Sequence, residues 1–130
     1  MLRVMQTKLL MFFIMISFSS CLGWGDIFSY KKSISENYEI AEDPGTGKKD
    51  IYFTNGDVEI GRIEDVVQVG WNDSIIIARS NNGYFILDKS RDSLNAEPRN
   101  VVDGPFDQST FLNRLKSAQV KNIEFKISYQ

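Results

Sequence analysis

The sequence predicts an α+β domain: an antiparallel β-sheet meander of about six to eight strands with one C-terminal helix packed on a face, followed by a last strand. Three observations support this prediction. Short runs of β-branched and aromatic residues recur along the chain between turn residues. The run 75–78, Ile-Ile-Ile-Ala, is apolar on both faces and predicts a buried central strand. Residues 108–118 place apolar side chains at helical spacing.

The first half of the predicted domain consists of strands and turns. Residues 27–33 and 38–41 are predicted strands, and proline and glycine residues mark 43–49 as a loop. Asn55-Gly56 predicts a hairpin, because both residues tolerate positive φ at the centre of a two-residue turn. We expect further strands at 66–71, 74–79 and 84–88, with turns at 72–73 and 80–83.

The C-terminal part is predicted to hold the helix and the last strand. Residues 89–104 are polar and contain Pro98, so we expect a mobile excursion there. Asp107 is predicted to cap the helix over 108–118. Residues 123–129 alternate and predict a half-buried strand at a sheet edge. The helix is expected to face the sheet with Phe111, Leu112, Leu115 and Ala118.

The first residues of the chain predict export. Arg3 and Lys8 are positively charged, residues 9–16 are uninterruptedly apolar, and serines follow, which is the three-part pattern of an export signal. A membrane-spanning helix is the weaker interpretation, because it needs about 20 mostly apolar residues. We therefore predict a signal peptide at 1–20, a tether at 21–26 and a single α+β domain at 27–130.

Cys21 is the only cysteine of the chain. Residues 18–21, Phe-Ser-Ser-Cys, resemble the lipobox of bacterial lipoproteins, although Phe18 stands where leucine is more usual. This resemblance implies that the chain is cut before Cys21, that its thiol carries diacylglycerol, and that acyl chains hold the protein at a membrane. The alternative interpretation is an ordinary cysteine near an ordinary cleavage site. A single cysteine excludes an internal disulfide.

The composition excludes several classes of function. The chain has no histidine, which removes Ser-His and Cys-His nucleophile pairs. Without Arg3 and Lys8 it has 13 basic and 17 acidic residues, and this balance does not favour nucleic-acid binding. We predict no catalytic residues, no metal site and no cofactor.

A few residues are candidates for a site. Asp57 and Glu59, which alternation places on one strand face, could act in acid–base chemistry or hold calcium, although a solvated strand face is the simpler interpretation. The glycines and lysines of 43–49 lack the spacing of a phosphate-binding loop. We expect contact with a ligand or partner at Trp71, Asn72, Asp73 and Trp24, because tryptophan offers a large contact area at a low entropy cost.

Several runs together resemble a family of small bacterial lipoproteins that carry a domain of unknown function. The runs are Gly70-Trp71-Asn72-Asp73, residues 75–78 and 83–88, Gly104-Pro105-Phe106, and Cys21 with the tether residues Gly23-Trp24-Gly25-Asp26. The resemblance spans most of the chain after the signal peptide. It implies a lipoprotein and implies no particular activity.

These observations together predict a membrane-anchored lipoprotein that acts as a non-enzymatic binding or interaction module of the bacterial cell envelope. Its expected partners are the membrane, through lipid on Cys21, and an envelope protein or peptide. Leu22 stands where an aspartate would resemble an inner-membrane retention signal. We therefore expect the outer membrane, facing the periplasm, or the outer face of the cell membrane in an organism with a single membrane. A carboxylate-dependent hydrolase or carbohydrate-active enzyme and a purely structural envelope protein are the alternatives, and the oligomeric state stays open.

Overall fold

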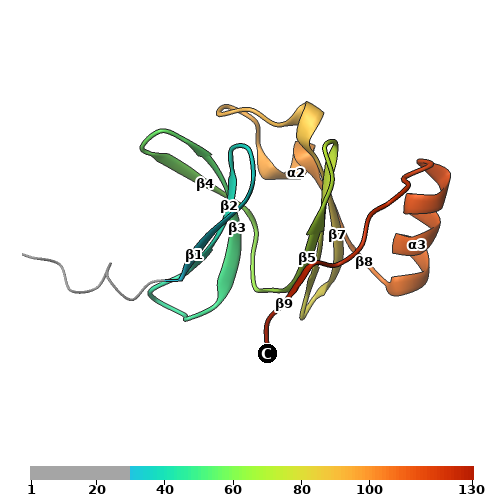
Figure 1. Ribbon diagram of the computed structural model, residues 1–130, viewed down its shortest axis with the longest axis horizontal. Coiled ribbons are helices and arrows are strands. Elements are labelled where there is room, and N and C mark those ends of the chain that lie inside the picture. The colour runs from blue at the N-terminus through green and yellow to red at the C-terminus, as the bar shows by residue number, and fades with distance from the viewer. Residues whose placement is uncertain (1–29) are drawn as a thin grey trace, which may run out of the picture.

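The computed structural model describes residues 30–130. The predicted signal peptide, Cys21, Trp24 and the first residues of the predicted strand at 27–33 lie outside the described residues. The described part is an α+β fold with nine strands in two antiparallel sheets, of order β1-β2-β3-β4 and β8-β7-β6-β5-β9. Figure 1 shows the sheets as neighbouring layers, with α3 on the far side of the second sheet.

The first sheet is a four-stranded meander. Its hairpin turn differs by one residue from the prediction: Asn55 pairs with Val58, so that Gly56 and Asp57 occupy the two central positions. Gly56 has φ +61°, as the first position of a type II′ turn requires. The strands are β1 (Lys31–Ser35), β2 (Tyr38–Glu42), β3 (Lys49–Asn55) and β4 (Val58–Ile63), and the residues between β2 and β3 form the predicted loop.

The second sheet contains the three strands predicted in the middle of the chain, each within one residue. The predicted single sheet is wrong, because the short link after β4 carries the chain to a second layer, and Asp65 in that link has φ +54°. Its strands are β5 (Val66–Trp71), β6 (Ile75–Ser80), β7 (Gly83–Asp88), β8 (Val102–Phe106) and β9 (Ile127–Ser128). The apolar strand β6 is central, as its sequence indicates.

The core lies between the two sheets. Fully buried side chains from both sheets meet there, among them Ile40, Ile51, Ile76 and Leu87. The opposite face of the second sheet is covered by α3 (Gln108–Ser117), on which Phe111 stacks against Tyr84 with ring centroids 4.8 Å apart.

Helix α3 begins as predicted. The Asp107 side chain accepts a hydrogen bond of 2.7 Å from the backbone N–H of Thr110, which caps the helix. Phe111 is buried, but Leu112 is 53% exposed, so the prediction that Leu112 faces the sheet is wrong. The reason is angular: successive residues of an α-helix point about 100° apart, and Phe111 already takes the side that faces the sheet. In residues 30–130 the helices are too short, or not apolar enough, to cross a membrane.

The stretch 89–104, predicted as an excursion, contains regular structure and contributes to the core. A short 3₁₀-helix η1 (Lys89–Arg91) and a helical turn α2 (Pro98–Val101) precede β8 in this stretch. Val101 is fully buried, and Pro98 occupies the first turn of α2, where its missing N–H costs nothing. Figure 1 shows α2 between the two sheets at their upper ends.

The last predicted strand is real but much shorter than expected. Only β9 pairs with β5, at the sheet edge. The preceding Phe125 stacks near Phe111 on the helix side, whereas Ile127 and Tyr129 pack against the core between the sheets. The chain can cross the sheet there because Gly70 has no side chain. A Cβ at this position would overlap the carbonyl of Glu124.

Candidate functional site

The predicted contact residues lie at the upper end of the sandwich, in the turn between β5 and β6. Trp71 ends β5, is half-buried against the core, and has the Lys126 Nζ 4.6 Å from its ring centroid. The Asn72 side chain accepts hydrogen bonds of 2.9 Å from the backbone N–H groups of Ser74 and Ile75. Trp71 and Asn72 thus shape the turn, and Asp73 is the exposed member of the set. Trp24 lies outside the described residues.

Asp73 stands on the rim of a polar hollow of about 570 Å³. The hollow lies between the turn from β1 to β2, the turn from β5 to β6, and the start of the 89–104 segment. Its lining includes Ser35, Glu36, Tyr38, Asp73, Lys89 and Asp92. Asp73 and Lys89 also line a second hollow, of about 790 Å³, on the side of the α3 C-terminus. These two residues therefore form a ridge between two concave surfaces.

Lys89 connects the two turns that bound the hollow. Its Nζ donates a hydrogen bond of 2.7 Å to the Ser35 Oγ and one of 2.6 Å to the carbonyl of Asn72. Burial lowers the pKa of the Lys89 ammonium below its usual value, while the carboxylates of Asp73 and Glu36 act in the opposite direction. The arrangement is a half-buried cation held between two sheets, with acidic groups around it.

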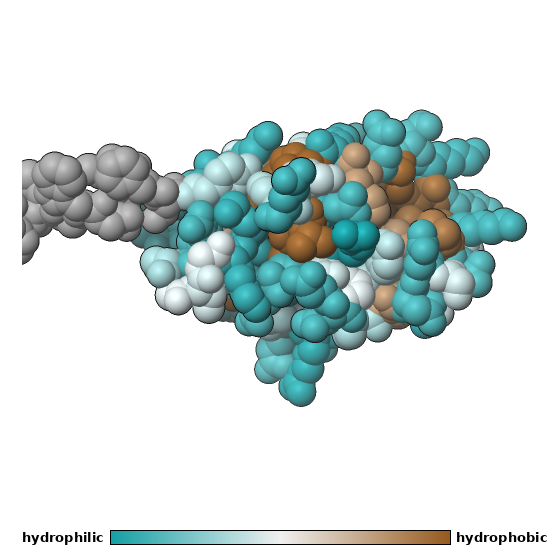
Figure 2. All heavy atoms as spheres, turned by 90° about the horizontal axis from the view of Figure 1, so that it is seen from below, coloured by the Kyte–Doolittle hydropathy of each residue, from teal (hydrophilic) through white to brown (hydrophobic). Residues whose placement is uncertain are grey.

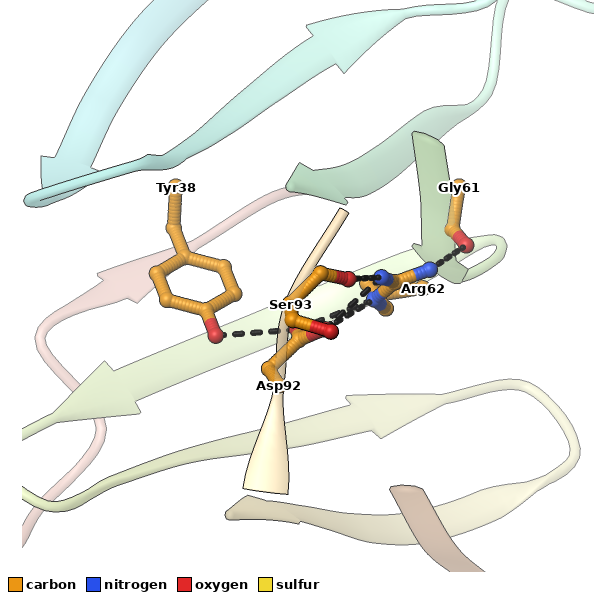
Figure 3. A network of polar contacts seen from close by, with 5 residues as sticks. All are labelled: Tyr38, Gly61, Arg62, Asp92 and Ser93. Atoms are coloured by element: carbon orange, nitrogen blue, oxygen red, sulfur yellow. Dashed lines mark hydrogen bonds and ion pairs between the residues drawn. The ribbon is translucent and has the colours of Figure 1, made fainter. Parts of the chain in front are cut away.

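Asp92, in the lining of the hollow, belongs to a buried ion pair, shown in Figure 3. Arg62 donates from Nη2 to the Asp92 Oδ1 at 2.7 Å and from Nε to the Oδ2 at 2.9 Å, and both side chains are 0% exposed. The Tyr38 hydroxyl donates a further bond of 2.9 Å to Asp92. Arg62 also donates to the Ser93 carbonyl at 3.1 Å. We call Tyr38, Arg62 and Asp92 the buried triad.

The buried triad fastens the segment 89–104 to the first sheet. Arg62 points inward because a register shift opposite Ile51 and Tyr52 breaks the alternation of β4, so that both Arg62 and Ile63 are buried. Burial is the main cause that raises the pKa of the Tyr38 hydroxyl, and its bond to Asp92 adds to the effect. The ion pair thereby holds Lys89, three residues before Asp92, at the hollow.

The two carboxylates predicted to form a pair do not share a strand face. Asp57 lies in the turn, one position away from the strand face on which it was expected. Glu59 is bound by Lys31, whose Nζ also lies 2.9 Å from the Glu39 Oε1, and this contact with Lys31 lowers the pKa of Glu59. In the part of the chain that the structure describes, no group of three or more acidic or cysteine side chains could hold a metal ion.

Sequence reasoning missed Arg62, Asp92 and Lys89. The bulge that buries Arg62 has no sequence signal. Asp92 and Lys89 fall in the stretch predicted as an excursion.

The loop at 43–49 closes on itself, since Asp43 accepts hydrogen bonds of 2.7 Å from the N–H groups of Gly45 and Gly47, as expected for a simple surface turn.

Comparison of this chain with known protein families, with curated proteins and with solved structures found no match. The resemblance to small lipoproteins therefore stays a prediction.

Proposed function

We propose that this chain is a lipid-anchored, non-enzymatic binding module of a bacterial cell envelope, and that it binds an envelope protein or peptide at the hollow beside Asp73 and Lys89. The observation that carries the proposal is the position of the hollow relative to Tyr30, the first residue that the structure describes. Tyr30 precedes β1, and Ser35, which bonds Lys89, ends the same strand. A strand of this length spans about 17 Å, so the hollow, which Ser35 lines, lies at the opposite end of β1 from Tyr30. Figure 1 shows the turn after β1 at the upper end of the domain.

The tether limits how far the domain stands from the bilayer. The predicted tether, 21–26, and the three residues after it reach at most about 30 Å when fully extended. A domain attached through lipid on Cys21 would stay close to the surface, with the end around Tyr30 directed towards it. The hollow would then face the aqueous side, where an envelope protein or peptide can approach it.

The chemistry of the hollow suits a polar partner. Lys89, Asp73 and Glu36 supply one cation and two carboxylates, and the buried triad fixes the segment that carries Lys89. Groups that are already ordered lose little conformational entropy when a partner binds, which favours recognition at a small site. Figure 2 views the opposite end of the domain, from below, where hydrophilic side chains surround apolar ones that gather near the middle and towards the right.

Site-specific photo-crosslinking tests this proposal. A photo-reactive amino acid replaces Asp73 in the full chain, which is expressed in a bacterium that processes lipoproteins. The matched control carries it at Asn113, which is exposed on α3. We expect a discrete adduct from position 73, none from position 113, and a weaker adduct when Cys21→Ala removes the anchor. Equal adducts at both positions would contradict a binding site at the hollow, and no adduct at either would favour a purely structural role.

One contact favours a hydrolase as the second candidate. A serine hydroxyl beside an amine whose pKa is lowered is the arrangement of a nucleophile and its base, and the carboxylates of Glu36 and Asp73 lie in the same hollow. A fluorophosphonate probe distinguishes the two functions. Labelling that disappears in Ser35→Ala would support the hydrolase and overturn the non-enzymatic proposal. Absence of labelling on Ser35 is the result that the binding module predicts.

A further inference from the structure

The edges of the two sheets are protected unequally. In the part of the chain that the structure describes, the edge strands are β1, β4, β8 and β9. Strand β1 presents Lys31 and Lys32 and contains a register shift, β8 contains Pro105, which has no N–H to donate, and β9 has two residues. Lysines, bulges, prolines and short strands are the devices that keep sheet edges from pairing. Strand β4 has no lysine, no proline, and a free stretch before its bulge.

The free stretch of β4 is Val58–Gly61, since the following Arg62 and Ile63 are buried under the 89–104 segment. The pair Asn55–Val58 closes a two-residue turn, and such closing pairs are hydrogen-bonded. Hydrogen-bonded and non-hydrogen-bonded residues alternate along an antiparallel strand. The backbone N–H and C=O groups of Glu59 and Gly61 therefore point away from β3, to the open side of β4. The Gly61 carbonyl already accepts a hydrogen bond of 3.3 Å from the Arg62 Nη1 (Figure 3), but a carbonyl oxygen has two lone pairs and can accept a second one. Within residues 30–130 these four groups therefore can bond to a second strand.

Exposed apolar side chains flank the same stretch. Val58 is 45% exposed and Leu94 is 38% exposed, and these are two of the three large hydrophobic side chains that the described residues expose. Leu94 follows Ser93, whose carbonyl accepts a hydrogen bond from Arg62 at the end of β4. Apolar groups therefore lie at both ends of the free edge.

We propose that two copies of this chain pair through β4, antiparallel and around a two-fold axis at Ile60. This register sets Glu59 opposite Gly61 of the second copy, so that the four outward backbone groups of each copy bond to those of the other. Ile60 meets Ile60 of the second copy, and Val58 comes beside the Ser93–Leu94 segment of the second copy. The result is one continuous eight-stranded sheet.

Charge and space select this register. Centring the pair on Glu59 would set two carboxylates directly opposite each other, which is destabilising. In the Ile60 register Glu59 faces a residue with no side chain, and a Cβ at Gly61 would have nothing within 4 Å in the single copy. The few contacts make a weak interface in solution. The proposed lipid anchor would favour this pairing by raising the local concentration of the chain at a membrane. The pairing depends on the proposed function in no other way.

Disulfide trapping tests the pairing in the full chain. Ile60→Cys is expressed in bacterial membranes and oxidised, with Leu112→Cys on the exposed side of α3 as the matched control. We expect a disulfide-linked dimer from position 60 and none above background from position 112. Gly61→Glu, added to Ile60→Cys, sets like charges opposite each other and should reduce the dimer about tenfold. Glu59→Lys together with Gly61→Glu should restore it.

Two further measurements keep the outcomes distinct. Sedimentation of the detergent-solubilised wild-type chain should show a dimer at high protein concentration, and the Gly61→Glu chain should be a monomer, so that the test does not depend on a cysteine. Trapping is repeated with Cys21→Ala at high concentration, where the dimer persists even if the anchor proposal fails. No trapped dimer at position 60, an adduct with a different protein there, or a dimer insensitive to Gly61→Glu would overturn the pairing.

Discussion

The two ends of the sandwich are held together by similar chemical groups in different surroundings. We call the end around Tyr30, where β1 begins and which the predicted tether precedes, the tether end. There Tyr30 and Tyr129 share a hydrogen bond of 2.9 Å between their hydroxyls, and the Lys49 Nζ lies 5.2 Å and 5.6 Å from the two ring centroids. At the hollow end, Tyr38 bonds Asp92, and Asp92 is paired with Arg62. The first set is half-buried, whereas the side chains of the ion pair are 0% exposed.

Burial, rather than the type of group, therefore decides how much each contact contributes to the free energy of unfolding. Breaking a buried ion pair leaves an uncompensated charge in a medium of low dielectric and costs about 3–5 kcal/mol. A half-exposed contact is replaced by water when it is lost, so its removal costs about 1 kcal/mol or less. The hollow end should therefore be much more sensitive to substitution than the tether end.

The largest expected effect comes from Asp92→Ala. It leaves the Arg62 guanidinium buried without its partner and should lower the free energy of unfolding by about 3–5 kcal/mol. Denaturant unfolding followed by circular dichroism measures this loss. Asp57→Ala, in the exposed hairpin turn, is the matched control and should change the free energy by about 0.5 kcal/mol or less. A loss of similar size in both variants would show that the pair does not hold the hollow end.

Tyr38→Phe should have an intermediate effect. The substitution keeps the ring and removes only the hydroxyl that donates to Asp92, and hydrogen bonds to charged groups contribute about 1.5–3 kcal/mol. The same unfolding experiment measures it. In the Asp92→Ala background the effect of Tyr38→Phe should shrink, because its acceptor is already gone, and full additivity of the two losses would contradict the shared network.

Tyr129→Phe should have a smaller effect, at the tether end. It removes one hydroxyl from the pair with Tyr30 and leaves the rings in contact, so we expect a loss of about 1 kcal/mol or less. The measurement is again denaturant unfolding. A loss for Tyr129→Phe that exceeds that for Tyr38→Phe would reverse the proposed order of the two ends.

The free energy of unfolding should also depend on alkaline pH, through Tyr38 and Tyr129. Burial, followed by a hydrogen bond, raises the pKa of both Tyr38 and Tyr129 above the ordinary value of 10.0. The fold favours the neutral hydroxyl, so this stabilisation is complete below pH of about 10 and is lost as pH rises above it towards the pKa of the folded protein. Unfolding free energies measured from pH 8 to 11 should fall less steeply in Tyr38→Phe than in the wild type, and an unchanged slope would contradict this assignment.

The sequence predicted what local patterns determine. Alternation and turn residues placed β5, β6 and β7 within one residue, and the cap at Asp107 placed the start of α3. It did not predict the hairpin turn, because Asn55 stays in its strand and moves the turn by one position. That shift took Asp57 off the strand face and removed the predicted pair with Glu59.

The buried triad could not be predicted, because its members are distant in the chain. Arg62 and Asp92 are 30 residues apart, and Tyr38 and Asp92 are 54 apart. From its sequence, a polar stretch with a proline resembles an irregular loop. Only the structure shows that Asp92 in this stretch pairs with the buried Arg62. Asp73 was predicted as a contact residue from the turn alone, whereas Lys89, its neighbour on the rim, was found only in the structure.

The assignment of a membrane-facing end and a binding end depends on Cys21. Intact mass spectrometry of the full-length gene product, isolated from bacterial membranes, tests that assignment most directly. The account predicts a mass for residues 21–130 increased by diacylglycerol, with or without a further acyl chain on the new amino terminus. A soluble product that keeps Met1, or one with an unmodified thiol at Cys21, would contradict it.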